Sequence, residues 1–157
     1  MSAAEQQRPD DLSPWQEGVL SIPEQYHLAG LTGRAVGKTH LIGPLSVRHI
    51  EEHGERAHIV IVRRSFPGSL DLENDLRRYF GSVYGSTASY NAALHRWIFP
   101  NGATLQIDQL DSEAAFSKFQ GRSYSLLIVD EAQQFPSPSL LDRLWSNLRA
   151  PIGTPTR

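Results

Sequence analysis

The sequence predicts an α/β fold, with a mainly parallel sheet flanked by helices, and three observations support this prediction. Two continuous apolar runs, His58 to Arg63 and Ser125 to Val129, are typical of strands buried on both faces. Segments with helical periodicity alternate with these runs along the chain. A glycine-rich turn within residues 31–41 follows a strand-like segment and precedes a helical one. This pattern is that of a layered domain with helices packed on the faces of its sheet.

Composition restricts the class of protein before any motif is weighed. The chain has 157 residues, of which 39% are hydrophobic and 20% charged, and this is the size of one globular domain. The sequence has no cysteine for disulfides or thiolate metal sites, and no apolar run approaches the roughly 18 residues of a membrane span. The N-terminus is polar, unlike a signal peptide, so we expect a cytoplasmic protein without a membrane partner. A net charge of -2 does not decide whether the protein binds nucleic acid.

The elements follow in chain order. Residues 1–20 carry Pro9, Pro14 and many polar side chains, which predicts a flexible N-terminal arm or lid. The remaining residues, 21–157, are expected to form the domain itself. Gln25 to Leu31 predicts a short central strand that leads into the glycine-rich turn.

Two helices and a hairpin complete the prediction. Apolar residues recur at helical spacing over residues 72–83, with charged residues on the other face, which indicates an amphipathic helix. An Asn-Gly pair at residues 101–102 lies between two β-rich runs and predicts a hairpin, with Pro100 in its turn. Near the C-terminus, Ser137 is a candidate N-cap with Pro138 at the first helical position. The buried stripe of that last helix would be Leu140, Leu141, Leu144, Trp145 and Leu148.

The glycine-rich turn has the pattern of a phosphate-binding loop, or Walker A motif. Such a loop follows a strand and opens a helix, because its backbone N–H groups and the positive helix end hold phosphate oxygens together. Lys38 would reach the β- and γ-phosphates of ATP, Thr39 would bind Mg²⁺, and Gly33 and Gly37 supply positions without side chains. The alternative is a glycine-rich turn with a surface lysine. The predicted cofactor-binding residues are Thr32, Gly33, Arg34, Ala35, Val36, Gly37, Lys38 and Thr39.

A second nucleotide motif supports the first. Four apolar residues, Leu126 to Val129, run into Asp130 and Glu131. A Walker B motif needs this arrangement, in which a buried strand delivers one carboxylate to Mg²⁺ and the next to the attacking water. Acidic pairs also occur at strand ends without any catalytic role. The two motifs in one chain predict a P-loop NTPase of the class whose catalytic glutamate follows the Walker B aspartate.

In these motifs the chain resembles the N-terminal ATPase of the large terminase subunits of tailed bacteriophages. "TGRAVGKT" is similar to the phosphate loop of that family, with an arginine and a small residue before Gly-Lys-Thr. The resemblance continues through "IVIVRRSFPGSLDLENDL", "WIFPNGATLQI" and "FQGRSYSLLIVDEAQQF", and so covers residues 25–149. It implies an ATP hydrolase that drives DNA into the capsid.

The resemblance also implies roles for individual residues. Glu131 would orient and deprotonate the attacking water, and Asp130 would hold Mg²⁺ together with Thr39. Arg34 would contact the γ-phosphate within its own subunit, and Arg122 is the candidate finger that reaches a neighbouring subunit's nucleotide. For either arginine the alternative is a surface ion pair of small energy.

The family further implies partners: double-stranded DNA, a portal protein, a small terminase subunit and further copies of the chain, all in the cytoplasm of a bacterial host. Arg63 and Arg64, at the end of a strand, could contact DNA or nucleotide, although we favour a solvated strand end.

Three departures from the family pattern affect the expected fold. Thr32 replaces a glycine of the phosphate loop, and Pro44 falls where it should bend the following helix. The family continues with a coupling strand, further ATPase structure and a nuclease domain, so we expect a P-loop fold that is incomplete on its C-terminal side. Segments 25–31 and 125–131 would then flank an empty position in the sheet. Other interpretations are a fragment of a superfamily 1 helicase or thymidine-kinase-like enzyme, or a truncated nucleotide-binding protein without catalysis.

Overall fold

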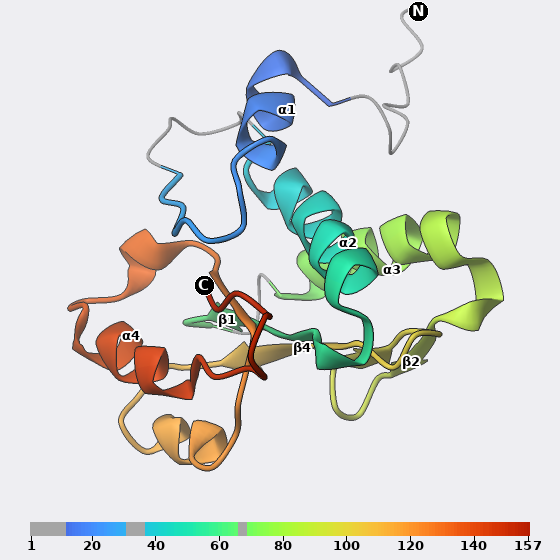
Figure 1. The fold of residues 1–157 in the computed structure, drawn as a ribbon. Coiled ribbons are helices and arrows are strands. Elements are labelled where there is room, and N and C mark those ends of the chain that lie inside the picture. The colour runs from blue at the N-terminus through green and yellow to red at the C-terminus, as the bar shows by residue number, and fades with distance from the viewer. Residues whose placement is uncertain (1–11, 31–36, 66–68) are drawn as a thin grey trace, which may run out of the picture.

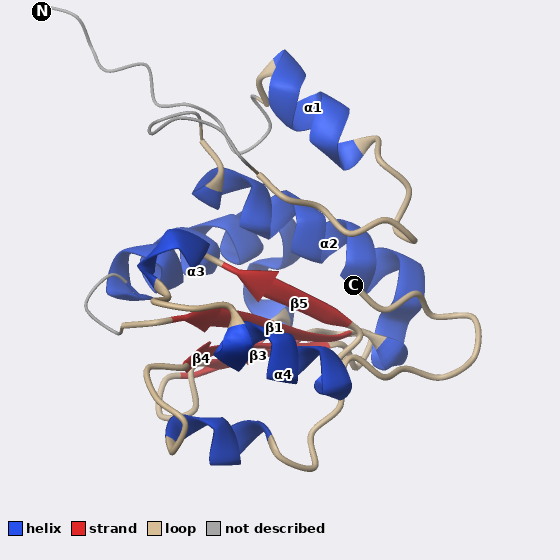
Figure 2. Ribbon diagram, turned by 90° about the vertical axis from the view of Figure 1, so that its left-hand side faces the viewer, coloured by secondary structure: helices blue, strands red, loops and turns tan. Residues whose placement is uncertain are grey.

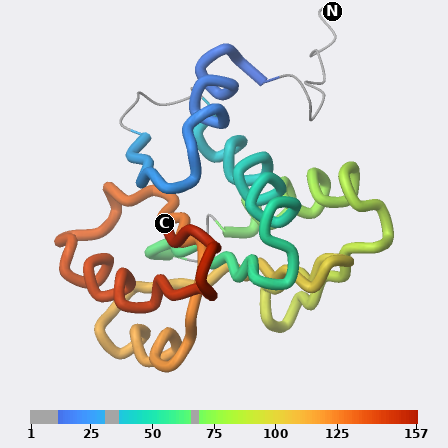
Figure 3. The backbone as a smooth tube through the Cα atoms, viewed as in Figure 1, coloured from blue at the N-terminus to red at the C-terminus, as the bar shows by residue number. Residues whose placement is uncertain are grey.

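A five-stranded sheet lies at the centre of the protein, with the strand order β2-β3-β4-β1-β5. The computed structural model describes residues 12–30, 37–65 and 69–157. Figure 1 and Figure 3 show α2 and α3 on one side of the sheet and α4 on the other. The strands are β1 (His58–Arg63), β2 (Ser89–Asn91), β3 (Arg96–Ile98), β4 (Thr104–Gln109) and β5 (Leu126–Val129). The α-helices are α1 (Pro14–Leu20), α2 (Ile42–His53), α3 (Ser69–Tyr84) and α4 (Ser139–Leu144).

Short 3-10 turns connect several of these elements. They are η1 (Thr39–Leu41), η2 (Gly54–Arg56), η3 (Gly85–Thr87), η4 (Ala115–Phe119), η5 (Ala132–Gln134) and η6 (Trp145–Asn147). In the part of the chain that the structure describes, no helix is long and apolar enough to cross a membrane.

Strand β1 separates two hydrophobic cores, which explains its continuous apolar sequence. Ile59 and Ile61 pack with residues of α2 and α3 in one core. Val60 and Val62 face the other core, which η4, α4 and the residues around them cover. Successive side chains of a strand point to opposite faces, so a strand between two helical layers needs apolar residues at every position. β1 confirms the strand predicted at residues 58–63. β5 confirms the strand predicted at residues 125–129, but it begins at Leu126 and is mostly half-buried, because it is the outer strand of the sheet.

The sheet is mixed, so the prediction of a mainly parallel sheet was wrong. β1 pairs in parallel with both β4 and β5, but β3 is antiparallel to β4 and to β2. The predicted Asn-Gly hairpin is present and causes the difference, because a short turn at residues 99–103 returns the chain antiparallel. In that turn Gly102 has φ +87, and the Asn101 side chain donates to the Ile50 carbonyl of α2.

The observed helices agree with those predicted from the sequence, except in where they begin and end. The amphipathic helix predicted at residues 72–83 is α3. Pro44 lies in the first turn of α2, where a helix leaves N–H groups without partners, so the bend expected from this residue has no cause there. The last helix begins later and ends earlier than predicted, with Pro138 at the N-cap position and no side-chain cap from Ser137. Trp145, expected in its buried stripe, is 48% exposed.

Part of the arm expected at residues 1–20 is helical. Ser13 caps α1 by accepting a hydrogen bond from the Gln16 backbone, and the Gln16 side chain bonds back to the Ser13 backbone. Pro14 occupies the first position of this helix, where its missing N–H costs no hydrogen bond. Ser13 and Gln16 thus form a capping box that, together with Pro14, fixes the start of α1.

The central strand predicted at residues 25–31 is not formed. Residues 25–30 are exposed and have no strand structure, and Leu31 is outside the described residues. β5 is the outer strand of the sheet, and its free side accepts the backbone of Arg157: the Arg157 N–H donates to the Ser125 carbonyl, and the Leu127 N–H to the Arg157 carbonyl. Residues 25–30 therefore lack a neighbouring strand to pair with. Instead, His27 contacts the ring of Trp145 edge-on, with ring centroids 4.7 Å apart.

Candidate nucleotide-binding site

The candidate site lies at the carboxyl ends of β1 and β5. In Figure 2, α2 runs opposite to these two strands, so its amino end lies at the same end of the sheet as Arg63 and Asp130. In open α/β sheets, ligands bind outside the carboxyl ends of the strands. The fold thus places the Gly-Lys-Thr segment and the aspartate-glutamate pair at the end of the sheet where ligands bind.

The described part of the predicted phosphate loop begins at Gly37. Gly37 has φ +76, Lys38 is exposed, and Thr39 is the first residue of η1, which continues directly into α2. A Cβ built on Gly30 would lie 3.4 Å from Cδ of Lys38, so the Lys38 side chain lies beside the backbone of Gly30. The predicted residues Thr32, Gly33, Arg34, Ala35 and Val36 lie outside the described residues.

Gln16 of α1 contacts this loop and was not predicted from the sequence. Its side-chain amide donates to the Gly37 carbonyl at 3.1 Å, and only 5% of the residue is exposed. A Cβ on Gly37 would lie 2.8 Å from the same amide nitrogen, so the contact needs glycine at this position. Gln16 therefore fixes the backbone of the residue immediately before Lys38. The Ser-Pro-Trp-Gln sequence at residues 13–16 has capping-box spacing, a signal that could have revealed α1, although not its contact with the loop.

Asp130 forms a buried ion pair with Arg63. The Arg63 guanidinium donates from Nε and from a terminal nitrogen to the same Asp130 oxygen, with the first distance 2.8 Å. The two side chains are 8% and 10% exposed. The Asp130 N–H donates to the Val62 carbonyl, so the aspartate still belongs to the β1–β5 ladder. Arg63 is thus not the solvated strand end that we favoured, because it neutralises the carboxylate expected to bind Mg²⁺.

Glu131 lies where the chain leaves the sheet. Its backbone has left-handed dihedral angles, φ 54 and ψ 44, and its side chain is exposed. Its N–H donates to the other Asp130 oxygen at 3.1 Å, and its carboxylate accepts from the Gln134 side chain. Left-handed angles are strained for a residue with a side chain, and such strain is often found at functional sites. The two carboxylates are therefore adjacent but different, one buried and paired, the other turned into solvent.

Arg122 and Arg64 both have exposed side chains. The Arg122 guanidinium is 3.7 Å from a carboxylate oxygen of Asp108, and its side chain is 49% exposed. This is the surface ion pair considered for Arg122 from the sequence, and contact with a neighbouring subunit stays a prediction. Arg64 donates to the Gln134 carbonyl, so it braces the turn that follows Glu131.

The chain matches a known protein family. Residues 29–149 match the family described as terminase large subunit, T4likevirus-type, N-terminal, so the match spans the glycine-rich turn, the hairpin and both carboxylates. No curated protein and no solved structure matches the chain.

Proposed function

The chain belongs to the family of T4-type terminase large subunits, represented by its N-terminal part, and we propose that it is the ATP-binding part of a motor that packages phage DNA. In this proposal the bound nucleotide is Mg-ATP, and its hydrolysis in the assembled motor moves double-stranded DNA into the capsid. Family membership supports the role in DNA packaging, and the site geometry supports the assignment to nucleotide chemistry.

One observation carries the proposal: a glycine-lysine-threonine turn at the amino end of α2 lies at the same end of the sheet as the Asp130-Glu131 pair. The positive end of the helix and the Lys38 ammonium both favour phosphate, and Thr39 supplies a hydroxyl for a hard cation. Asp130 supplies a carboxylate oxygen for the same cation. Arg63 holds that carboxylate, and the ion would compete with this guanidinium for its oxygens.

Glu131 is the residue that we propose as the base for water. Its carboxylate is exposed and close in sequence to Asp130, so a water bound beside the cation would lie within its reach. Arg34 and Arg122 are the residues proposed to stabilise the charge that develops on the γ-phosphate, Arg34 within the subunit and Arg122 across to the next copy. The portal protein and small terminase subunit are proposed partners of the whole motor.

The proposal is tested by the affinity of the chain for a fluorescent ATP analogue in the presence of Mg²⁺. Lys38→Ala should weaken binding at least tenfold, since the ammonium charge on the phosphates is lost. The sequence offers a matched control in its other lysine. Lys118→Ala removes the same charge from an exposed side chain that donates to the Gln109 carbonyl, and it should leave the affinity unchanged. Equal affinities for wild type and Lys38→Ala would contradict the phosphate-loop assignment.

A further inference from the structure

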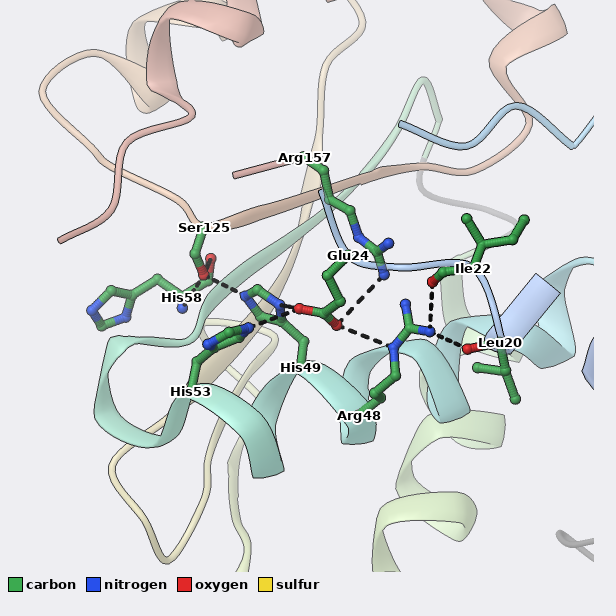
Figure 4. Close-up of polar contacts among 9 residues, drawn as sticks. All are labelled: Leu20, Ile22, Glu24, Arg48, His49, His53, His58, Ser125 and Arg157. Atoms are coloured by element: carbon green, nitrogen blue, oxygen red, sulfur yellow. Dashed lines mark hydrogen bonds and ion pairs between the residues drawn. The ribbon is translucent and has the colours of Figure 1, made fainter. Parts of the chain in front are cut away.

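A cluster of buried ionisable side chains lies away from the candidate nucleotide site. Glu24, His49 and His53 are 7%, 0% and 6% exposed. In Figure 4 both imidazoles point at the same carboxylate oxygen of Glu24, with Nδ1 of His49 at 2.9 Å and Nε2 of His53 at 2.8 Å. These three ligand atoms lie within 4.8 Å of one another.

The residue types and spacing are those of a site for a borderline divalent cation. His49 and His53 are four residues apart on α2, which places both rings on one face of the helix. Glu24 precedes the glycine-rich turn in sequence and brings its carboxylate onto that face. Two imidazoles and one carboxylate are a recurring ligand set for Zn²⁺, with a further position left for water.

Outer contacts orient two of the three ligands. Nε2 of His49 lies 2.8 Å from the Ser125 hydroxyl at the start of β5, and that hydroxyl also accepts the His58 N–H. Arg48 donates to the other oxygen of Glu24 at 3.1 Å. Partners of this kind fix the ring tautomer and carboxylate orientation in metal sites. Without an ion, Nδ1 of His49 and Nε2 of His53 donate their protons to Glu24, and a cation would displace these two protons. Nε2 of His49 would keep its contact with Ser125.

The charges around the cluster set its expected affinity. Burial alone raises the pKa of Glu24, but hydrogen bonds from both histidines and the charges of His49 and Arg157 lower this pKa to about 2, so the carboxylate is ionised. The guanidinium groups of Arg48 and Arg157 lie 3.1 and 3.6 Å from the second oxygen of Glu24 and oppose a further positive charge. A three-ligand site with this opposition should be weaker than a closed structural zinc site, with a Kd on the order of micromolar.

We propose that Glu24, His49 and His53 bind one Zn²⁺ ion. The ion joins the segment before the glycine-rich turn to the helix that follows it, and Ser125 extends the connection to β5. The site is buried, so the ion has a structural role and does not meet the nucleotide. Because no nucleotide takes part, the inference stands or falls independently of the proposed function.

The test uses the full 157-residue chain, freed of metal with a chelator and without a histidine tag. Calorimetric titration with Zn²⁺ should give one ion per chain, and His53→Asn and Glu24→Gln should each weaken this binding at least tenfold. His58→Asn is the matched control, because His58 has an exposed imidazole bonded to Thr104, and it should bind Zn²⁺ like the wild type.

A second measurement needs no variant and remains decisive if the variants fail to fold. In long-range proton-nitrogen NMR spectra of the wild type, Zn²⁺ should shift the ring nitrogens of His49 and His53 and leave those of His58 and His95 in place. Uptake of much less than one ion, equal affinity in the folded His53→Asn variant, or shifts confined to other histidines would each overturn the proposal. The cluster would then be an ion-free network of hydrogen bonds around Glu24.

Discussion

Asp130 and Glu131 are neighbours in sequence with opposite environments, and substitutions should separate their contributions. Asp130→Asn removes the charge from the buried carboxylate that pairs with the Arg63 guanidinium, which should lower the free energy of unfolding by about 3 kcal/mol. Glu131→Gln changes an exposed side chain and should change stability by less than about 0.5 kcal/mol. Chemical denaturation of both variants measures the difference.

The same pair should also divide in nucleotide chemistry. Asp130→Asn should weaken Mg²⁺-dependent ATP binding, whereas Glu131→Gln should keep binding and abolish hydrolysis in the assembled motor. The assigned roles would be wrong if the two variants had identical affinities for Mg-ATP.

Gln16 is the residue whose contribution to the loop can be measured most directly. Gln16→Ala removes the hydrogen bond to the Gly37 carbonyl, and we expect ATP affinity to fall about fivefold, equivalent to about 1 kcal/mol for one hydrogen bond. Gln25→Ala removes the same side chain from an exposed position and should leave the affinity unchanged. If both variants bind the analogue as the wild type does, the contact with Gly37 has no role in binding.

Motif spacing alone predicts Lys38, Thr39, Asp130 and Glu131 as site residues, because nucleotide chemistry requires particular residue types after a strand and at the start of a helix, and their roles stay predictions. It could not reveal the partners Gln16 and Arg63. Gln16 is distant in sequence from the loop it contacts, and Arg63 at a strand end is equally consistent with solvent exposure. Only the packing of α1 and the register of β1 against β5 determine these contacts.

At the scale of an element, the hairpin turn between β3 and β4 depends on one glycine. Gly102 has φ +87, and a Cβ there would lie 3.1 Å from Cβ of Glu55, so Gly102→Ala should destabilise the protein by about 1–2 kcal/mol. Gly81 lies in α3, where an added Cβ would meet no atom within 4 Å, and Gly81→Ala should instead stabilise the protein by about 0.5–1 kcal/mol. Thermal unfolding should show a lower Tm than the wild type for Gly102→Ala and a higher Tm for Gly81→Ala. Shifts of the same sign would mean that the turn tolerates a side chain.

Elements with strong periodicity were predictable, and elements that depend on a neighbour were not. The residues of β1 and α3 carry their patterns in their own sequence, because every face that they bury is marked by apolar side chains. Gln25 to Gly30 looks like a strand locally, but a strand needs a pairing partner, and the free edge of β5 is paired with the backbone of Arg157.

At the scale of the whole molecule, we expect the position of residues 25–30 outside the sheet to slow the proposed ATP hydrolysis. These residues lead into the predicted phosphate loop, and within the described part of the chain no strand pairing sets their position relative to Asp130. We expect the 157-residue chain alone to turn over ATP more slowly than about one per second, below the usual enzyme range. A phosphate-release assay on the purified monomer measures this rate, and a faster turnover would show that the site is already complete.

The left-handed backbone of Glu131 should affect which residue a screen of substitutions recovers at this position. Glycine or asparagine adopts these dihedral angles at lower cost than glutamate, so either would be favoured in a library screened only for resistance to heat. A library screened for phage yield should retain glutamate if the carboxylate activates water. The screen for stability and the screen for phage yield would then favour different residues at position 131. Recovery of glutamate only in the second screen would indicate that its carboxylate takes part in hydrolysis.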